Sequence, residues 1–514
     1  MNREESIALF NQGREVWNAW AHRKFAQRKA LMDRGQWFAD DAGGSTVASQ
    51  TWWDESTADF SDQVFEEDAD FASFVFPGST SFHGATFGGT AEFGQVRFED
   101  EVDFQGVTFE DQARFGLAVF KGYAGFGQAT FKRGAWFQKA KFGGAALFEH
   151  ALFVSRAGFH EAVFERNSAF AAVNFEGDAE FVQATFSELA AFQEATFEGQ
   201  AKFSQAAFTR GVRFRRVNFN GPAWFRQCGF FGATDYSQSR FLRSADFNAI
   251  ETTTAFSLAG ATFQVVPDFV QAHFSEALRC DDISIATKSF RPRTWAEAKD
   301  GFKGNPDLPA RWRALKRLAI QGHDHEHEQI FFKGELLARR WHADKPWSAA
   351  FWFGVLYQWL SDFGRSLLRP LVWWGVSLVL FAGVYLSQHD FLKTHDASTT
   401  VVSMAAVFPS VEPPQDLLCR SSKDNAVTAA FDLSIRNALL FVGQTSREKL
   451  RQNYVCLYGS ERIETSSSSA SGQASNAAPR IPNFVVLMGH LQNVISAVLI
   501  FLFLLGIRNH FKIK

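Results

Sequence analysis

The chain has 514 residues and a formal net charge of −3, so it is long enough for several domains and has no overall basic field suited to nucleic acid. It contains 59 Phe beside only 6 Tyr and 4 Met, a bias that predicts one structural slot filled repeatedly by the same residue. The motifs G-x-x-x-x-G-K-S/T, H-E-x-x-H, C-x-x-C and G-x-S-x-G do not occur. We therefore predict no enzyme activity and no cofactor.

Residues 1–55 are predicted to form a helical cap. The stretch from Met1 to Phe25 lacks the continuous apolar core of a secretory signal, so we expect most of the protein in the cytoplasm. It fits an amphipathic helix, which Asn2 can cap with Glu5 three residues later. The element Trp17-Asn18-Ala19-Trp20 and the pair Trp52-Trp53 are the expected covers of whatever follows.

From Phe60 to Phe230, Phe recurs at alternating steps of 5 and 6 residues, and the register then weakens without slipping through Thr252 and Leu258 to Cys280. A small residue, most often Ala, stands two positions before each Phe. Residues two apart on an extended strand point the same way, so both are predicted to point inward and the residue between them outward. A 3.6-residue helix cannot keep such a period on one face. Representative ladder positions are Phe82, Phe87, Phe93, Phe104, Phe126, Phe148, Phe181, Phe197 and Phe219.

This A-x-F pattern with 5/6 spacing resembles the Phe-centred pentapeptide repeats of membrane-associated bacterial proteins. The resemblance implies a β-solenoid over residues 56–290: a right-handed quadrilateral parallel β-helix with about 22 residues per coil, in about ten coils. The W-N-x-W element also resembles a leader that precedes such repeats in membrane-associated members.

The outward positions of the repeat carry charges that change along the chain. They are acidic early, as at Glu99 and Asp100, and basic later. Ordinary solubility explains this pattern, and a docking surface for an unidentified protein partner is the alternative. The basic patch comprises Arg210, Arg213, Arg215, Arg216 and Arg226.

Residues 291–346 are predicted to form an α-helical hairpin that links the solenoid to the C-terminal part. His323 and His327 would stand one helical turn apart in it and are the candidate ligands of a zinc site. The interpretation we favour is a polar, exposed helix start, because acidic residues suit the N-terminal end of a helix and no further His or Cys cluster lies nearby.

Two apolar segments predict a two-helix transmembrane module in a lipid membrane. Residues 347–370 form an interfacial amphipathic helix, 371–386 the first span and 484–507 the second, followed by a basic tail at 508–514. Basic residues at both outer ends predict that both termini and the solenoid lie in the cytoplasm, and the resemblance implies the bacterial inner (plasma) membrane. The rival interpretation is a pair of buried helices in a soluble domain.

The loop 387–483 would be extracytoplasmic, where an oxidising compartment favours a disulfide between Cys419 and Cys456. It contains a short amphipathic helix at 429–443, so that the order span, short helix, span matches a two-span pore module. No Thr-Val-Gly-Tyr-Gly filter follows Gly443, and Asp432 and Arg436 could equally form a pair on a helix surface.

Three functional hypotheses follow. The leading one is a membrane-anchored scaffold whose rigid solenoid binds a protein partner, with no nucleic acid expected. The second is an oligomeric, channel-like membrane protein that the solenoid gates or regulates, which would require a homo-oligomer. The third is a DNA-mimicking protein that binds gyrase, which requires a continuous acidic surface that the basic patch interrupts.

Overall fold

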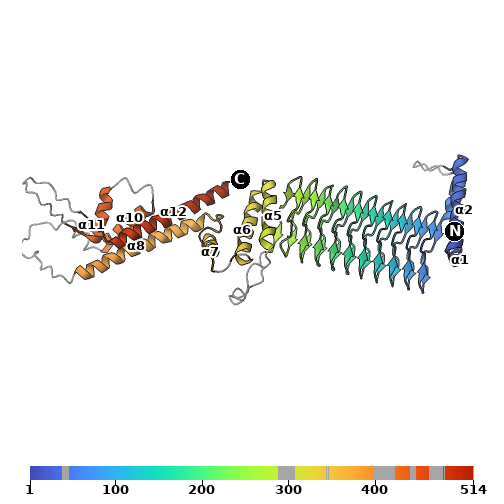
Figure 1. The fold of residues 1–514 in the computed structure, drawn as a ribbon, viewed down its shortest axis with the longest axis horizontal. Coiled ribbons are helices and arrows are strands. Elements are labelled where there is room, and N and C mark those ends of the chain that lie inside the picture. The colour runs from blue at the N-terminus through green and yellow to red at the C-terminus, as the bar shows by residue number, and fades with distance from the viewer. Residues whose placement is uncertain are drawn as a thin grey trace, which may run out of the picture. The chain divides into compact units, whose positions relative to one another are not determined.

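The structure is a computed structural model of the chain (Figure 1). The chain divides into two compact units, Met1–Lys345 and Pro346–Lys514, which are described separately. The described residues are 1–37, 46–286, 307–342, 344, 347–396, 423–439, 447–461, 478–479 and 481–512.

The first unit is built on a parallel β-solenoid whose strands are two residues long, from β1 (Ala58–Asp59) to β41 (Ser284–Ile285). The strands form four parallel sheets with 11, 11, 9 and 10 described members. Each residue pairs with the residues 22 positions away, as Phe109 does with Phe87 and Phe131. The predicted four-sided parallel solenoid with about 22 residues per coil is thereby confirmed, and Figure 1 shows the coils stacked along the unit.

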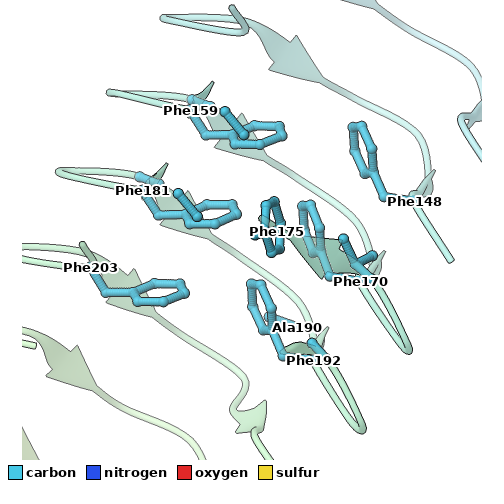
Figure 2. Close-up of a cluster of buried hydrophobic side chains, with 14 of the residues drawn as sticks. Phe148, Phe159, Phe170, Phe175, Phe181, Ala190, Phe192 and Phe203 are labelled. Carbon is cyan, nitrogen blue, oxygen red and sulfur yellow. The ribbon is translucent and has the colours of Figure 1, made fainter. Parts of the chain in front are cut away.

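Phenylalanine rings fill the interior of the coils in stacks that follow the strands. Phe181 is fully buried and lies between Phe159 and Phe203, with ring centroids 4.7 and 4.8 Å away and planes parallel to within 2° (Figure 2). It meets the neighbouring stack edge to face at Phe170 and Phe192. The centroid distance matches the spacing of hydrogen-bonded strands, so the backbone ladder itself sets the aromatic stacking. All nine representative ladder residues are 0–1% exposed.

A left-handed residue forms the corner inside each five-residue step of the repeat. Every eleventh residue from Asp62 to Asp282 has a left-handed backbone, with φ between 54° and 68°. Only three of these corner residues are Gly, and the others include Leu117 and Ala172, each at a cost of about 1–2 kcal/mol. Backbone hydrogen bonds between coils offset that cost, as in the 2.7 Å bond that the Asp62 amide donates to the His83 carbonyl.

Three helices cover the N-terminal end of the solenoid: α1 (Arg3–Phe10), α2 (Arg14–Asp33) and α3 (Val47–Ser56). The predicted cap at Asn2 is confirmed: its side-chain oxygen accepts from the Glu5 amide, and the Glu5 carboxylate accepts from the Asn2 amide. The prediction of one helix from Met1 to Phe25 was wrong, because Gly13 has φ 89° and separates α1 from α2.

Side chains of the cap replace the hydrogen bonds that a preceding coil would provide. The Asn18 side-chain amide donates to the Ser73 carbonyl (3.0 Å) and accepts from the Val75 amide (2.9 Å). The Trp17 indole donates to the Val75 carbonyl at 3.0 Å, and the Ser6 hydroxyl accepts from the Asp59 amide. The first coil is therefore closed against edge-to-edge pairing, the usual hazard at the end of a solenoid.

Near the other end, one stack of rings is interrupted at Thr252, which stands between Phe230 and Phe274. Thr252 is buried, and its hydroxyl has no hydrogen-bond partner among the described residues. Phe256, in a slot that is usually Ala, turns its ring inward, 5.5 Å from the Phe230 ring and 5.4 Å from the Phe274 ring. Leu258 is also smaller than Phe, so the Phe256 ring occupies space that two short side chains leave.

The hairpin of α5 (Leu308–Gln321) and α6 (His325–His342) was predicted as a linker, and it also covers the last coils. Trp312 is buried in the same hydrophobic core as the ladder. Arg311 donates to the Val266 carbonyl at 3.3 Å and pairs with Asp268 at 3.3 Å. The hairpin thus protects the C-terminal edge as the first three helices protect the other.

The second unit is helical. The helices among its described residues are α7 (Ala349–Ser361), α8 (Leu368–Asp396), α10 (Lys423–Ala438), α11 (Arg447–Tyr458) and α12 (Asn483–Lys512). A two-residue pairing of β42 with β43 adds to them.

The boundaries in this unit differ from the sequence-based ones. The segment 347–370 is not one helix, because Asp362, Phe363 and Gly364 take left-handed backbone and end α7. The helix predicted over 371–386 starts earlier and runs to Asp396, since Pro370 falls in the first turn of α8, where it is tolerated. The helix predicted over 429–443 is shifted toward the N-terminus and ends at Ala438.

Candidate functional site

Helices α8 and α12 are long and apolar enough to cross a membrane, over Leu368–Leu392 and Asn483–Phe511. Only 28% of the most apolar stretch of each is buried, whereas a core helix of a soluble domain would be mostly buried. The second unit therefore exposes an apolar belt far larger than scattered surface residues. The belt includes Val372, Val376, Val379, Leu380, Leu487, Leu491, Val494, Val498, Phe501 and Leu504.

The shorter helix α10 packs against both long helices through small residues on one face. Ala426, Ala430 and Ser434 are buried there. The Ser434 hydroxyl donates to the Leu378 carbonyl on α8 at 2.8 Å. The Gln492 side chain on α12 donates to the Ser434 carbonyl at 2.9 Å and to its hydroxyl at 2.7 Å. These bonds fix α10 at the level of Leu378, near the middle of the apolar stretch of α8.

A second set of hydrogen bonds completes a buried polar cluster. The Tyr385 hydroxyl donates to the Gln492 carbonyl oxygen at 2.8 Å and accepts from the Asn437 amide at 3.0 Å. The Tyr458 hydroxyl donates to the Tyr385 carbonyl, and His389 contacts the Leu457 carbonyl at 2.8 Å. Tyr385, His389, Tyr458 and Gln492 are buried. Hydrogen bonds between buried polar groups favour one arrangement of α8, α10, α11 and α12.

Another face of α10, beside α11, is partly exposed and carries charge. Arg436 pairs with Asp432 at 2.7 Å, one helical turn away, and Asn453 on α11 also donates to Asp432. The Asp432 side chain remains 45% exposed. The third residue predicted for this site, Gly443, lies outside the described residues.

A sequence model described as pentapeptide repeats (9 copies) matches residues 71–119, 159–206 and 181–229, all within the solenoid. The solenoid therefore contains pentapeptide repeats. No curated protein matches it. No solved structure matches it.

The zinc hypothesis for the hairpin that follows the pentapeptide-repeat solenoid loses its geometric premise. His323 has φ 54° and precedes α6, so it is not one turn of a helix away from His327. His327 contacts Asp324 at 2.6 Å, and His325 contacts Glu328 at 3.1 Å. Within the described ranges, no group of three or more metal-ligating side chains comes together.

The four cysteines separate between the two units. Cys228 and Cys280 are free and buried in the pentapeptide-repeat solenoid, where burial raises the pKa of both thiols, that of Cys280 to about 12. Cys456 is disulfide-bonded. Cys419 lies outside the described residues, so the pairing of Cys419 with Cys456 stays a prediction.

The surface of the pentapeptide-repeat solenoid carries ion pairs between adjacent coils. Glu99 bonds to Lys121 and to Arg97, each at 2.7 Å. Burial opposes ionisation of the Glu99 carboxyl, but the two basic side chains outweigh it and lower its pKa from the ordinary 4.5. Most such pairs are half exposed, so each adds little stability. Arg213 and Arg215 of the basic patch are exposed, with no ion pair to another described residue.

Two features were missed at the level of sequence. Gln492 is a polar residue inside the apolar segment 484–507, and such a residue is itself a sign of a functional or packing contact. Phe256 breaks the small-residue slot two positions before Leu258, which would have pointed to a local repacking of the ladder.

Proposed function

We propose that the chain is a membrane-anchored pentapeptide-repeat scaffold, in which α8 and α12 cross the bilayer and the solenoid binds a protein partner in the cytoplasm. The observation that carries this proposal is the exposed apolar belt of α8 and α12. Exposure of such a belt to water costs free energy, whereas the hydrocarbon core of a lipid bilayer solvates it. Arg369 near the start of α8 and Arg508 near the end of α12 lie where the positive-inside rule puts cytoplasmic residues.

The solenoid suits a scaffold because its shape does not depend on a ligand. The ladder of Phe rings and the two helical caps give a rigid surface, and rigid surfaces bind with a small loss of conformational entropy. Arg213 and Arg215 are exposed on that surface and form no ion pair within the described part of the chain, so they suit an acidic partner.

Alkaline carbonate extraction of membranes that contain the full chain tests the anchor. We expect the protein to stay with the lipid pellet, because two spanning helices bind far more tightly than electrostatic attachment. Release into the supernatant would refute the anchor. Cross-linking in cells tests the solenoid surface. The double variant Arg213→Glu/Arg215→Glu should no longer cross-link to partner proteins, whereas Thr196→Ala, on another sheet, should still cross-link to them.

The second candidate is an oligomeric, channel-like protein, and the level that α10 reaches between α8 and α12 favours it. A helix that enters a bilayer only halfway occurs where protein or a water-filled cavity surrounds it. Ion flux through liposomes that contain the purified chain would support this candidate, and its absence would leave the scaffold. The gyrase hypothesis is the least favoured, because the basic patch interrupts the acidic surface that it needs.

A further inference from the structure

Helix α7 exposes an apolar face that carries no charge. The helix Ala349–Ser361 contains no Asp, Glu, Lys or Arg. Its residues Trp352, Phe353, Leu356 and Trp359 are 47–69% exposed. Because residues three and four apart lie on one side of a helix, these four form a continuous patch. Tryptophan is enriched where the hydrocarbon of a bilayer meets the lipid headgroups, since its ring is apolar and its indole N–H is polar.

Hydrogen bonds hold the C-terminal end of α7 to both apolar helices. The Arg369 guanidinium of α8 donates to the Gln358 carbonyl at 3.2 Å and pairs with Asp362 at 3.8 Å. The Asn509 side chain of α12 donates to the Gly364 carbonyl at 3.2 Å. The turn that follows α7 therefore lies beside the start of α8 and the end of α12.

Two arginines flank the contact between this turn and α12. Arg365 follows Gly364 and Arg508 precedes Asn509, so the hydrogen bond between Gly364 and Asn509 brings both arginines to the same end of the unit. Both are exposed, and neither forms an ion pair with another described residue. Burial raises the pKa of the Tyr357 hydroxyl, and the positive charge of Arg508 opposes that rise, so Arg508 also lies close to α7.

The level of the two arginines in a bilayer follows from the lengths of the apolar stretches. Leu368–Leu392 has 25 residues and Asn483–Phe511 has 29, so the two stretches are about 37 and 43 Å long. A hydrocarbon core is about 30 Å thick, and the headgroups on both sides bring the bilayer to about 40–45 Å. When each stretch is centred in the bilayer, Arg365 and Arg508 fall in or at the edge of the headgroup layer, where the lipid phosphates lie.

We propose that Arg365 and Arg508 bind the phosphate of an anionic phospholipid in the cytoplasmic leaflet, with the apolar face of α7 against the neighbouring lipids. This inference rests on the membrane anchor proposed above, and it names the class of lipid that the anchor selects. Guanidinium groups bind phosphate oxygens through paired, charge-assisted hydrogen bonds. An anion between the two arginines also reduces their mutual repulsion. A phosphate ion in solution would leave the apolar face of α7 in water, so the occupant is a lipid.

Lipid retention by the detergent-purified full chain tests the site. The chain is mixed with equal amounts of phosphatidylglycerol and phosphatidylcholine that have the same acyl chains, and native mass spectrometry measures which lipid stays bound. The site variant Arg365→Gln/Arg508→Gln is compared with Arg133→Gln/Arg240→Gln, which removes two exposed arginines from the solenoid. Excess glycerol phosphate is added to a further sample of the native chain, because it has the headgroup phosphate without the acyl chains.

We expect the native chain and the solenoid variant to retain phosphatidylglycerol over phosphatidylcholine by at least about fivefold, because each arginine near an anionic lipid surface contributes about that factor. The site variant should lose most of this preference, and glycerol phosphate should not displace the lipid. No preference in the native chain, an equal preference in the two variants, or displacement by glycerol phosphate overturns the inference.

Carbonate extraction of the same proteins separates the lipid site from the anchor. If the chains stay with the lipid pellet while the site variant keeps its preference, the lipid site is wrong and the anchor stands. If the native chain is released into the supernatant, the anchor and the lipid site are both overturned.

Discussion

The pair Thr252 and Phe256 predicts a strong energetic coupling inside the ladder. Thr252→Phe alone places a second ring where the Phe256 ring already lies between Phe230 and Phe274. Such overpacking costs about 1–3 kcal/mol. Phe256→Ala alone removes a fully buried ring and costs about 3–5 kcal/mol. The double variant rebuilds the regular repeat, with Phe in the ladder slot and Ala in the small slot, and also removes the buried hydroxyl without a partner.

We therefore expect the double variant Thr252→Phe/Phe256→Ala to lie within about 1 kcal/mol of the native chain, which gives a coupling energy of about 3 kcal/mol or more. Native-state hydrogen exchange of peptides from the last four coils measures these differences locally, without requiring the whole chain to unfold in one step. Additive effects of the two substitutions, or stabilisation by Thr252→Phe alone, would show that the Phe256 ring does not fill the place of the missing ladder ring.

Three further predictions concern the regular coils. Phe181→Asp should destabilise the solenoid by at least about 4 kcal/mol in hydrogen exchange, because it removes a stacked ring and buries a carboxylate. Thr196→Asp, on an outward position, should change the stability by no more than about 0.5 kcal/mol. Equal effects of the two substitutions would contradict the inward register. Gly221→Ala places a Cβ 1.9 Å from a backbone oxygen of the preceding coil and should cost about 1–3 kcal/mol, while Gly116→Ala meets nothing nearer than 3.8 Å and should not destabilise. Because the pKa of Glu99 is lowered in the folded state, its ionised carboxylate stabilises the fold above the unfolded pKa of 4.5, and this stabilisation is lost as the pH falls through the folded pKa. Glu99→Gln should remove this pH-dependent stabilisation from a curve of stability against pH. An unchanged curve would refute the assignment to Glu99.

The solenoid was predictable because each coil repeats a local rule. Two positions per five or six residues determine which side chains point inward, so an error at one position does not propagate to the next. The same rule located the irregular residue Thr252 but not its consequence. Phe256 fills the gap from another sheet of the same coil, and such a contact depends on side-chain volumes in three dimensions.

The second unit was less predictable, because long-range polar contacts decide its arrangement. Apolar composition predicted that two long helices exist, but not where they begin, since α8 tolerates Pro370 in its first turn. The position of α10 depends on Ser434, whose partners Leu378 and Gln492 are 56 and 58 residues away in the chain. A short-range sequence period cannot predict contacts between residues so far apart in the chain. Likewise, His323 has a left-handed backbone and lies outside α6. The zinc hypothesis required His323 and His327 to lie in one continuous helix.

The 22-residue coil is made of two 11-residue halves with the same internal sequence rule. A duplication of 11 residues would therefore leave every Phe pointing inward and every corner intact. It would nevertheless turn all later coils by half a revolution, so that strands of the first sheet would continue into the third. A duplication of 22 residues lengthens the rod by one strand spacing, about 4.8 Å, and keeps each surface aligned. Both duplications therefore preserve the packing of the interior. Any selection against an 11-residue duplication must act through the outer surface.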